Sequence, residues 1–168
     1  MPTSSILGAL VVVVLTVACQ DEHRRPVTAP ATAPRSDTVF FVTVSNAEPA
    51  AGATVTVTAN VAQRAGFKPV ASFKAHLRYD ATGLTFLRES RLPSGIRAFH
   101  PQPGDLIAAG AAAEGFQDGR LFAATFRIQN PAALASLALE VEELNGTDFA
   151  NQLPAVRRGS LRVTPIRR

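Results

Sequence analysis

Cysteine and the larger aromatic residues are scarce in this chain of 168 residues, which has one Cys, one Tyr and no Trp. A single cysteine cannot form a disulfide within the chain, so the fold must depend on packing alone. Surfaces that bind sugars commonly use flat, exposed aromatic rings, and the lack of Trp therefore disfavours such a surface. Charged residues make up only 18% and hydrophobic residues 46%, a composition typical of one packed domain.

The residue patterns of catalytic sites are also missing. There is no Gly-x-Ser-x-Gly elbow and no glycine-rich phosphate loop. The histidines lack the paired spacing that gathers a metal site; they are His23, His76 and His100. Of the neighbouring Glu140, Glu142 and Glu143, the first two share the outward side of an expected strand, which favours a solvated face over acid–base chemistry or calcium binding. We therefore expect no enzyme activity, no catalytic residue, no metal site and no cofactor.

Basic residues exceed acidic ones by 17 to 13, and the excess is concentrated at the C-terminus. Five arginines fall in the last twelve positions: Arg157, Arg158, Arg162, Arg167 and Arg168. No aromatic residue that could stack on a nucleic-acid base lies between them. We therefore expect a solvated basic tail at residues 165–168 and no nucleic-acid partner.

The N-terminus has the features of an export signal. Residues 6–17 form an apolar run of about a dozen residues, too short to span a bilayer comfortably but suited to the apolar segment of a signal peptide. Residues 16–19, Thr-Val-Ala-Cys, resemble the lipobox of bacterial lipoproteins. This resemblance implies that residues 1–18 are a signal peptide and that Cys19 is lipidated, which would hold an exported protein at the cell envelope or surface. An ordinary cleaved signal and an uncleaved anchor are the alternatives.

Residues 19–36 are expected to form a flexible tether. They carry mixed charges followed by Val-Thr-Ala-Pro-Ala-Thr-Ala-Pro, in which the prolines favour extended backbone and no large apolar side chain offers a core contact. At about 3.1 Å per residue in polyproline geometry, this tether could hold the following domain up to roughly 50 Å from a membrane.

From residue 37 to residue 164 the apolar residues mostly alternate with polar ones, as in strands that bury one face. We expect strands at residues 38–45, 54–61, 72–80, 84–89, 106–112, 120–129, 137–144 and 160–164. Glycine, proline, asparagine or aspartate separates them. Many short strands with such punctuation predict an all-β domain, an antiparallel β-sandwich or a barrel.

Two segments of this domain are ambiguous. Residues 108–113, Ala-Ala-Gly-Ala-Ala-Ala, contain helix-favouring alanines, but the shortness of the segment and the glycines and proline around it favour a buried strand. Residues 130–136 are expected to form one helical turn, because Asn130 can cap it and Pro131 suits the first helical position.

Ordered motifs along residues 37–163 resemble those of cohesin domains. Ala-Glu-Pro-Ala-Ala-Gly at residues 47–52 is similar to the opening A-x-P-G-D-x-V, and residues 79–86, Tyr-Asp-Ala-Thr-Gly-Leu-Thr-Phe, to Y-D-P-x-x-L-x-F. Asp-Gly-Arg-Leu-Phe-Ala at residues 118–123, followed by Thr-Phe-Arg-Ile, is similar to D-G-x-L-A-x-x-x-F-x-V. The resemblance implies a cohesin-like jelly-roll β-sandwich of about nine strands, in the same superfamily as some carbohydrate-binding modules.

The cohesin resemblance also implies a function and a binding face. Cohesins are non-catalytic modules that receive the calcium-loaded dockerin module of another exported protein, which suggests a link to polysaccharide catabolism. The family's contact sheet contains the strand that matches residues 72–80. The partner-binding residues implied here are Ser72, Lys74, His76, Arg78 and Glu114.

Ser72 and Lys74 replace the Asn and Asp that the cohesin family often has at its early outward positions. We therefore expect a partner surface that is more acidic than a typical dockerin helix. Two alternatives remain at this point. The outward residues could be ordinary solvated strand positions, or the domain could be a carbohydrate-binding module of the same superfamily, in which case the partner is a polysaccharide.

Overall fold

The computed structural model describes residues 38–62, 67–157 and 164–165. They belong to one compact unit, Arg35–Arg168. The expected signal peptide, Cys19 and the tether lie outside the described residues, as do residues 160–163 of the last expected strand and residues 166–168 of the tail. Among the residues described, no helix combines the length and the apolar character needed to cross a bilayer.

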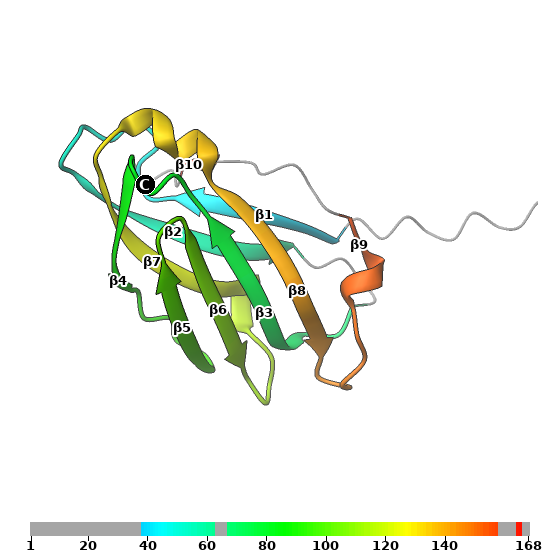
Figure 1. Ribbon diagram of the computed structural model, residues 1–168. Helices are drawn as coiled ribbons and strands as arrows, with labels where there is room; N and C mark the ends of the chain where they lie inside the picture. Colours follow the sequence, from blue (N-terminus) through cyan, green and yellow to red (C-terminus); the bar gives the residue numbers. More distant parts are fainter. Residues whose placement is uncertain (1–37, 63–66, 158–163, 166–168) are drawn as a thin grey trace, which may run out of the picture. The chain divides into compact units, whose positions relative to one another are not determined.

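The described residues form two sheets around one apolar core, and Figure 1 shows the four-stranded sheet in front of the six-stranded sheet. The six-stranded sheet has the order β10-β1-β2-β7-β4, with β9 also paired to β1. Its strands are β1 (Thr38–Val44), β2 (Thr54–Ala62), β4 (Leu84–Glu89), β7 (Arg120–Ile128), β9 (Val156–Arg157) and β10 (Thr164–Pro165). The four-stranded sheet has the order β5-β6-β3-β8. Its strands are β3 (Val70–Arg78), β5 (Ile96–Gln102), β6 (Asp105–Ala111) and β8 (Ala138–Gly146).

The strand pairs are antiparallel, except that β1 is parallel to the two-residue strands β9 and β10. Three short 3-10 helices connect strands: η1 (Gln117–Gly119), η2 (Pro131–Ser136) and η3 (Leu153–Ala155). This architecture confirms the predicted all-β antiparallel sandwich of about nine strands.

Alternation of side chains places apolar residues of β2 and β3 in the core. On β2 and β3 the buried apolar residues are Val55, Val57, Ala59, Val61, Val70, Phe73, Ala75 and Leu77. The outward positions of β2 are less exposed than expected, because Thr58 and Asn60 are only 8% and 7% exposed. Asn60 Nδ2 donates to Thr43 Oγ1 at 3.2 Å and to the carbonyl of Thr58 at 2.9 Å, so this polar side chain is satisfied within the sheet.

Aromatic rings join the two sheets. Phe73 on β3 stacks on Phe122 of β7 with ring centroids 6.0 Å apart, and Phe99 of β5 meets Phe122 edge-on at 6.1 Å. Tyr79 packs edge-on against Phe126 with centroids 5.1 Å apart. The core between the sheets therefore fixes the position of the four-stranded sheet.

Both ambiguous segments have the predicted backbone, a strand and a helical turn, but the alanine-rich strand is less buried than predicted, because only Ala108 of residues 108–111 is buried. β6 covers residues 105–111 and so includes most of the alanine-rich run, and η2 begins at Pro131 with Asn130 as its cap. Asn130 Oδ1 accepts a hydrogen bond from the Ala132 amide at 3.1 Å. This is the capping role expected of an asparagine before a proline at the first helical position.

Residues 96–102 were not among the expected strands, and this omission was wrong. They form β5, an edge strand paired with β6 in register from Ile96 with Ala111 to Gln102 with Asp105. Pro101 explains the omission, because a proline within a segment argues against a central strand but is tolerated in an edge strand.

Candidate functional site

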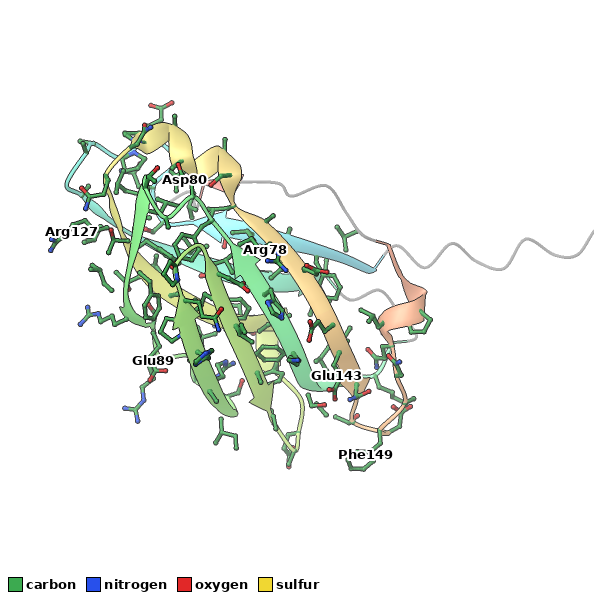
Figure 2. All side chains as sticks on the ribbon, viewed as in Figure 1. Arg78, Asp80, Glu89, Arg127, Glu143 and Phe149 are labelled. Atoms are coloured by element: carbon green, nitrogen blue, oxygen red, sulfur yellow. The ribbon has the colours of Figure 1, made fainter. Side chains whose placement is uncertain are left out.

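The outward side chains of β5, β6, β3 and β8 form a continuous surface, which we call the outer face. In register, His76 of β3 lies between Ile107 of β6 and Glu140 of β8, and His100 of β5 lies beside Ile107. Arg78 and Glu143 mark β3 and β8 on this face in Figure 2. Four of the five residues predicted for the partner-binding face, Ser72, Lys74, His76 and Arg78, lie on it.

Ion pairs across β3 link three strands of the outer face. Lys74 Nζ lies 2.6 Å from Glu142 Oε2 on β8. Arg78 lies between β8 and β6, with Nη2 3.4 Å from Glu140 Oε2 and Nη1 3.8 Å from Asp105 Oδ2. The two cations that the sequence analysis expected to be free for a partner are therefore engaged by neighbouring carboxylates.

His76 lies at the centre of this charged row, with its side chain 12% exposed. Its Nδ1 is 2.9 Å from Asp105 Oδ2 in a hydrogen bond, and its Nε2 is 3.1 Å from Glu142 Oε1 without hydrogen-bond geometry. A neutral imidazole has one donor and one acceptor nitrogen, so only the protonated ring presents an N–H to each carboxylate. His76 is thus hydrogen-bonded to a carboxylate of β6 and lies close to a carboxylate of β8.

The Lys74–Glu142 pair shifts the titration of both groups. The hydrogen bond and charge of Glu142 raise the pKa of Lys74, and the hydrogen bond from Lys74 lowers the pKa of Glu142. The two side chains are 49% and 44% exposed, so solvent screens the pair and its contribution to folding stability is small. The pair instead keeps both groups charged and holds their positions on the face.

A β-bulge on β8 adds a further carboxylate to the outer face. Lys74 is paired with Glu143 while the next residue, Ala75, is paired with Val141, so Glu142 is the extra residue of the bulge. Strict alternation had placed only Glu140 and Glu142 outward, yet Glu143 also lies exposed. The sequence shows three glutamates within four residues, but it does not show the register shift that exposes all three side chains on the outer face.

The charge of the outer face is opposite to the sequence-based expectation. Two cations, Lys74 and Arg78, face four carboxylates: Asp105, Glu140, Glu142 and Glu143. With the histidines neutral, these six groups have a net charge of −2. This net charge argues against a partner surface more acidic than a typical dockerin helix, an expectation that considered β3 without the strands on either side, because an acidic face complements a basic surface.

Beside the charged row, the outer face has a shallow hollow of about 430 Å³. Its floor is made of small residues on the paired strands β5 and β6: Ala98, Ala109, Gly110 and Ala111. Ile96, which is 77% exposed, Lys74 and Glu143 also line it. A Cβ at Gly110 would lie 2.6 Å from Phe73 Cε1, so the core ring occupies the space that a side chain at residue 110 would need. The alanine-rich run, which was predicted as a buried strand, instead forms part of the floor of a recess.

Ser72 and Glu114, the remaining predicted contact residues, lie at one end of the face. Ser72 Oγ accepts a hydrogen bond from Asn145 Nδ2 of β8 at 3.1 Å. Glu114 lies beyond the end of β6, in a turn closed by a hydrogen bond from the Gly115 amide to the Ala112 carbonyl at 3.0 Å. Glu114 is therefore exposed at the rim and does not belong to the charged row.

A second groove, of about 300 Å³, has the aromatic and proline side chains that a sugar site would use. It is lined in part by Tyr79, Phe86 and Pro101. The Tyr79 ring, however, packs against the core, and its hydroxyl donates to the Gln102 carbonyl at 3.0 Å. The only tyrosine is thus half-buried and engaged, which leaves the outer face as the better candidate.

No family model matches the sequence, and no curated protein sequence matches it either. Solved structures with a similar fold are cohesin modules. A non-cellulosomal cohesin from Archaeoglobus fulgidus aligns with a TM-score of 0.52 at 18% identity, over 73% of this chain and 86% of that one. The second type II cohesin module of the ScaA scaffoldin of Acetivibrio cellulolyticus gives a TM-score of 0.55 at 11% identity, over 75% and 95%. The cohesin module of a family 33 glycoside hydrolase from Clostridium perfringens gives 0.52 at 16%, over 68% and 88%. At these identities the similarity shows a cohesin-like fold alone.

Proposed function

We propose that this protein is a non-catalytic docking module of the cohesin type and that its partner binds the outer face of the four-stranded sheet. The proposal depends on one observation: a recess lined at its base by small side chains lies beside the charged row, whose net charge is negative. A helix can lay small apolar side chains into such a recess and direct Lys or Arg toward the carboxylates. A rigid sheet also loses little conformational entropy when it binds.

The proposed partner is an exported protein with a dockerin-like helical surface that carries basic residues. The dockerin class comes from the cohesin resemblance, and its basic character comes from the net charge of the outer face. A link to polysaccharide catabolism follows from the same resemblance. Carbohydrate binding by the domain itself is the second candidate, since the groove beside Tyr79 and Phe86 has suitable residue types.

Capture from the secreted proteins of the source organism tests the proposed function. The immobilised full chain is expected to retain a protein whose binding weakens as salt rises, because opposite charges meet at the outer face. Loss of capture with a calcium chelator identifies a calcium-loaded, dockerin-like partner. Retention of a polysaccharide in place of a protein supports the second candidate, and retention of neither rejects both.

A variant that fills the recess tests whether the partner binds at the outer face or elsewhere on the surface. In Ala109→Arg, a long cationic side chain occupies the floor, so we expect partner affinity to fall at least tenfold, measured by calorimetry with the captured protein. The matched control is Thr54→Arg, an exposed outward position on β2 of the other sheet, which should leave affinity unchanged. Equal affinities for both variants would place the docking site elsewhere.

We also propose that the protein is anchored in the cell envelope by lipid on Cys19, with residues 19–36 as its tether. The support is the lipobox-like Thr-Val-Ala-Cys sequence after an apolar run. The mass of the protein extracted from membranes is expected to equal the chain from Cys19 onward plus acyl groups. A Cys19→Ser variant should be released in soluble form. A mature mass without acyl groups contradicts the anchor and leaves the docking proposal unaffected.

A further inference from the structure

Phe149 is the most exposed large apolar side chain among the described residues, at 88% exposure. It lies in the turn between β8 and η3, at the tip of the molecule in Figure 2. Its backbone has φ +60°, in the left-handed region that favours glycine or asparagine. A phenylalanine in this position therefore satisfies neither the backbone preference of the turn nor the burial of an apolar side chain.

Hydrogen bonds on both sides hold this turn in shape. The Phe149 amide donates to the Gly146 carbonyl at 2.9 Å, and the Gly146 amide donates to the Ala150 carbonyl at 3.0 Å. The Thr147 amide donates to the Pro69 carbonyl at 3.0 Å, which ties the turn to the start of β3. Asp148 Oδ1 accepts from the Ala150 amide at 3.2 Å. The surrounding contacts thus impose the left-handed conformation and present the phenyl ring on a fixed support.

The turn continues the acidic edge of the outer face. Asn145 at the end of β8 donates through Nδ2 to Ser72 Oγ at 3.1 Å and to Glu143 Oε1 at 2.6 Å, and it forms a β-bridge with Asn151 beyond Phe149. Asp148, next to Phe149, is exposed. The turn that carries Phe149 is therefore flanked by the carboxylates of Glu143 and Asp148, which have the sign of the net charge of the outer face.

We propose that Phe149 is an aromatic anchor that enters an apolar pocket with a basic rim on the same protein that docks on the outer face. This inference rests on the proposed function and adds a residue that determines partner specificity. Exposed aromatic side chains that fill a pocket commonly supply a large share of the affinity at interfaces. The neighbouring carboxylates favour a basic protein surface over an anionic bilayer.

The substitution Phe149→Asn tests the anchor, because asparagine tolerates the left-handed backbone while it removes the ring. With the captured partner as probe, we expect the full chain carrying Phe149→Asn to bind at least tenfold more weakly, with a melting temperature that is unchanged or higher. Leu87→Asn is the matched control: Leu87 is a 40% exposed apolar residue on β4 of the other sheet, and its loss should leave affinity unchanged.

Four outcomes would overturn the anchor. Unchanged affinity of Phe149→Asn, with Ala109→Arg still impaired, rejects the anchor and keeps the docking face. A loss equal to that of Leu87→Asn shows only a general effect of exposed apolar area. Binding to vesicles of phosphatidylcholine and phosphatidylglycerol that disappears in Phe149→Asn, with partner affinity intact, assigns the ring to a lipid surface. If the wild-type chain retains no protein at all, the docking function itself fails, and the anchor fails with it.

Discussion

Replacing Phe122 with alanine is expected to lower the free energy of unfolding by about 3–5 kcal/mol, the largest effect of any change proposed for this protein. Phe122 is fully buried on β7, stacks on Phe73 and meets Phe99 edge-on. Its removal leaves a cavity between the sheets, because β7 is paired with β2 at Phe122 and with β4 from Ala124 onward, which limits how far the backbone can move inward to fill it. Urea denaturation followed by circular dichroism measures the loss.

Two further variants show whether the lower free energy of unfolding comes from the loss of aromatic packing between the sheets. Phe149→Ala removes the same number of atoms from an 88% exposed ring and should change the free energy of unfolding by less than about 0.5 kcal/mol. Phe122→Leu keeps most of the buried volume and should fall between the two. A loss below about 1.5 kcal/mol for Phe122→Ala would mean that the two sheets close over the gap, in conflict with a rigid support beneath the recess.

Alternation within each strand predicted an antiparallel sandwich or barrel, because it reports which residues are buried, and the cohesin resemblance implied the two-sheet sandwich. Residues 54–61 and 72–80 showed the pattern most clearly, and β2 and β3 bury the residues that it placed inside. The cap at Asn130 was equally readable, since it depends on residues that are neighbours in the chain. Features set within a strand or a turn were therefore predictable.

Features that depend on the neighbouring strand were not predictable. The pattern of β3 identified Lys74 and Arg78 as outward residues, but the sequence did not show that β8 and β6 place carboxylates against them. One inserted residue in β8 changes which glutamates lie outward, and alternation has no means of marking it. The net charge of the outer face, and with it the basic character of the proposed partner, therefore depends on the register between strands as well as on the pattern within β3.

Arg97 shows the same dependence on neighbours inside the sandwich. It points inward from the edge strand β5, where Nε donates to the Leu121 carbonyl and Nη1 to the Ser94 carbonyl, both at 2.5 Å. Nη2 donates to the Arg120 carbonyl at 3.3 Å, and the guanidinium lies 4.7 Å from the centre of the Phe116 ring. Burial, together with the charge of Arg120, lowers the pKa of Arg97. The side chain thus joins the edge of the four-stranded sheet to β7.

The Arg97 side chain takes the place of a neighbouring strand at the end of β7 where β4 no longer runs beside it. On one side of β7 the carbonyl of Ala123 accepts from the Ser90 amide just after the end of β4. Two residues earlier, the Leu121 carbonyl points to the same side, where β4 no longer continues, and Arg97 supplies the donor. Backbone acceptors removed from water need such a partner, so the arginine stabilises the fold despite its own desolvation.

Arg97→Met retains the apolar stem but removes all the donors, and it should lower the free energy of unfolding by about 2–3 kcal/mol, because the carbonyls of Leu121 and Arg120 lose their partner. Arg97→Lys keeps one charged donor group without the fork that reaches several carbonyls, so we expect an intermediate loss. Arg88→Met, at an exposed position of β4, is the matched control and should cost less than about 0.5 kcal/mol. Equal denaturation midpoints for Arg97→Met and Arg88→Met would show that water satisfies these carbonyls. The two sheets would then be joined by their apolar core alone.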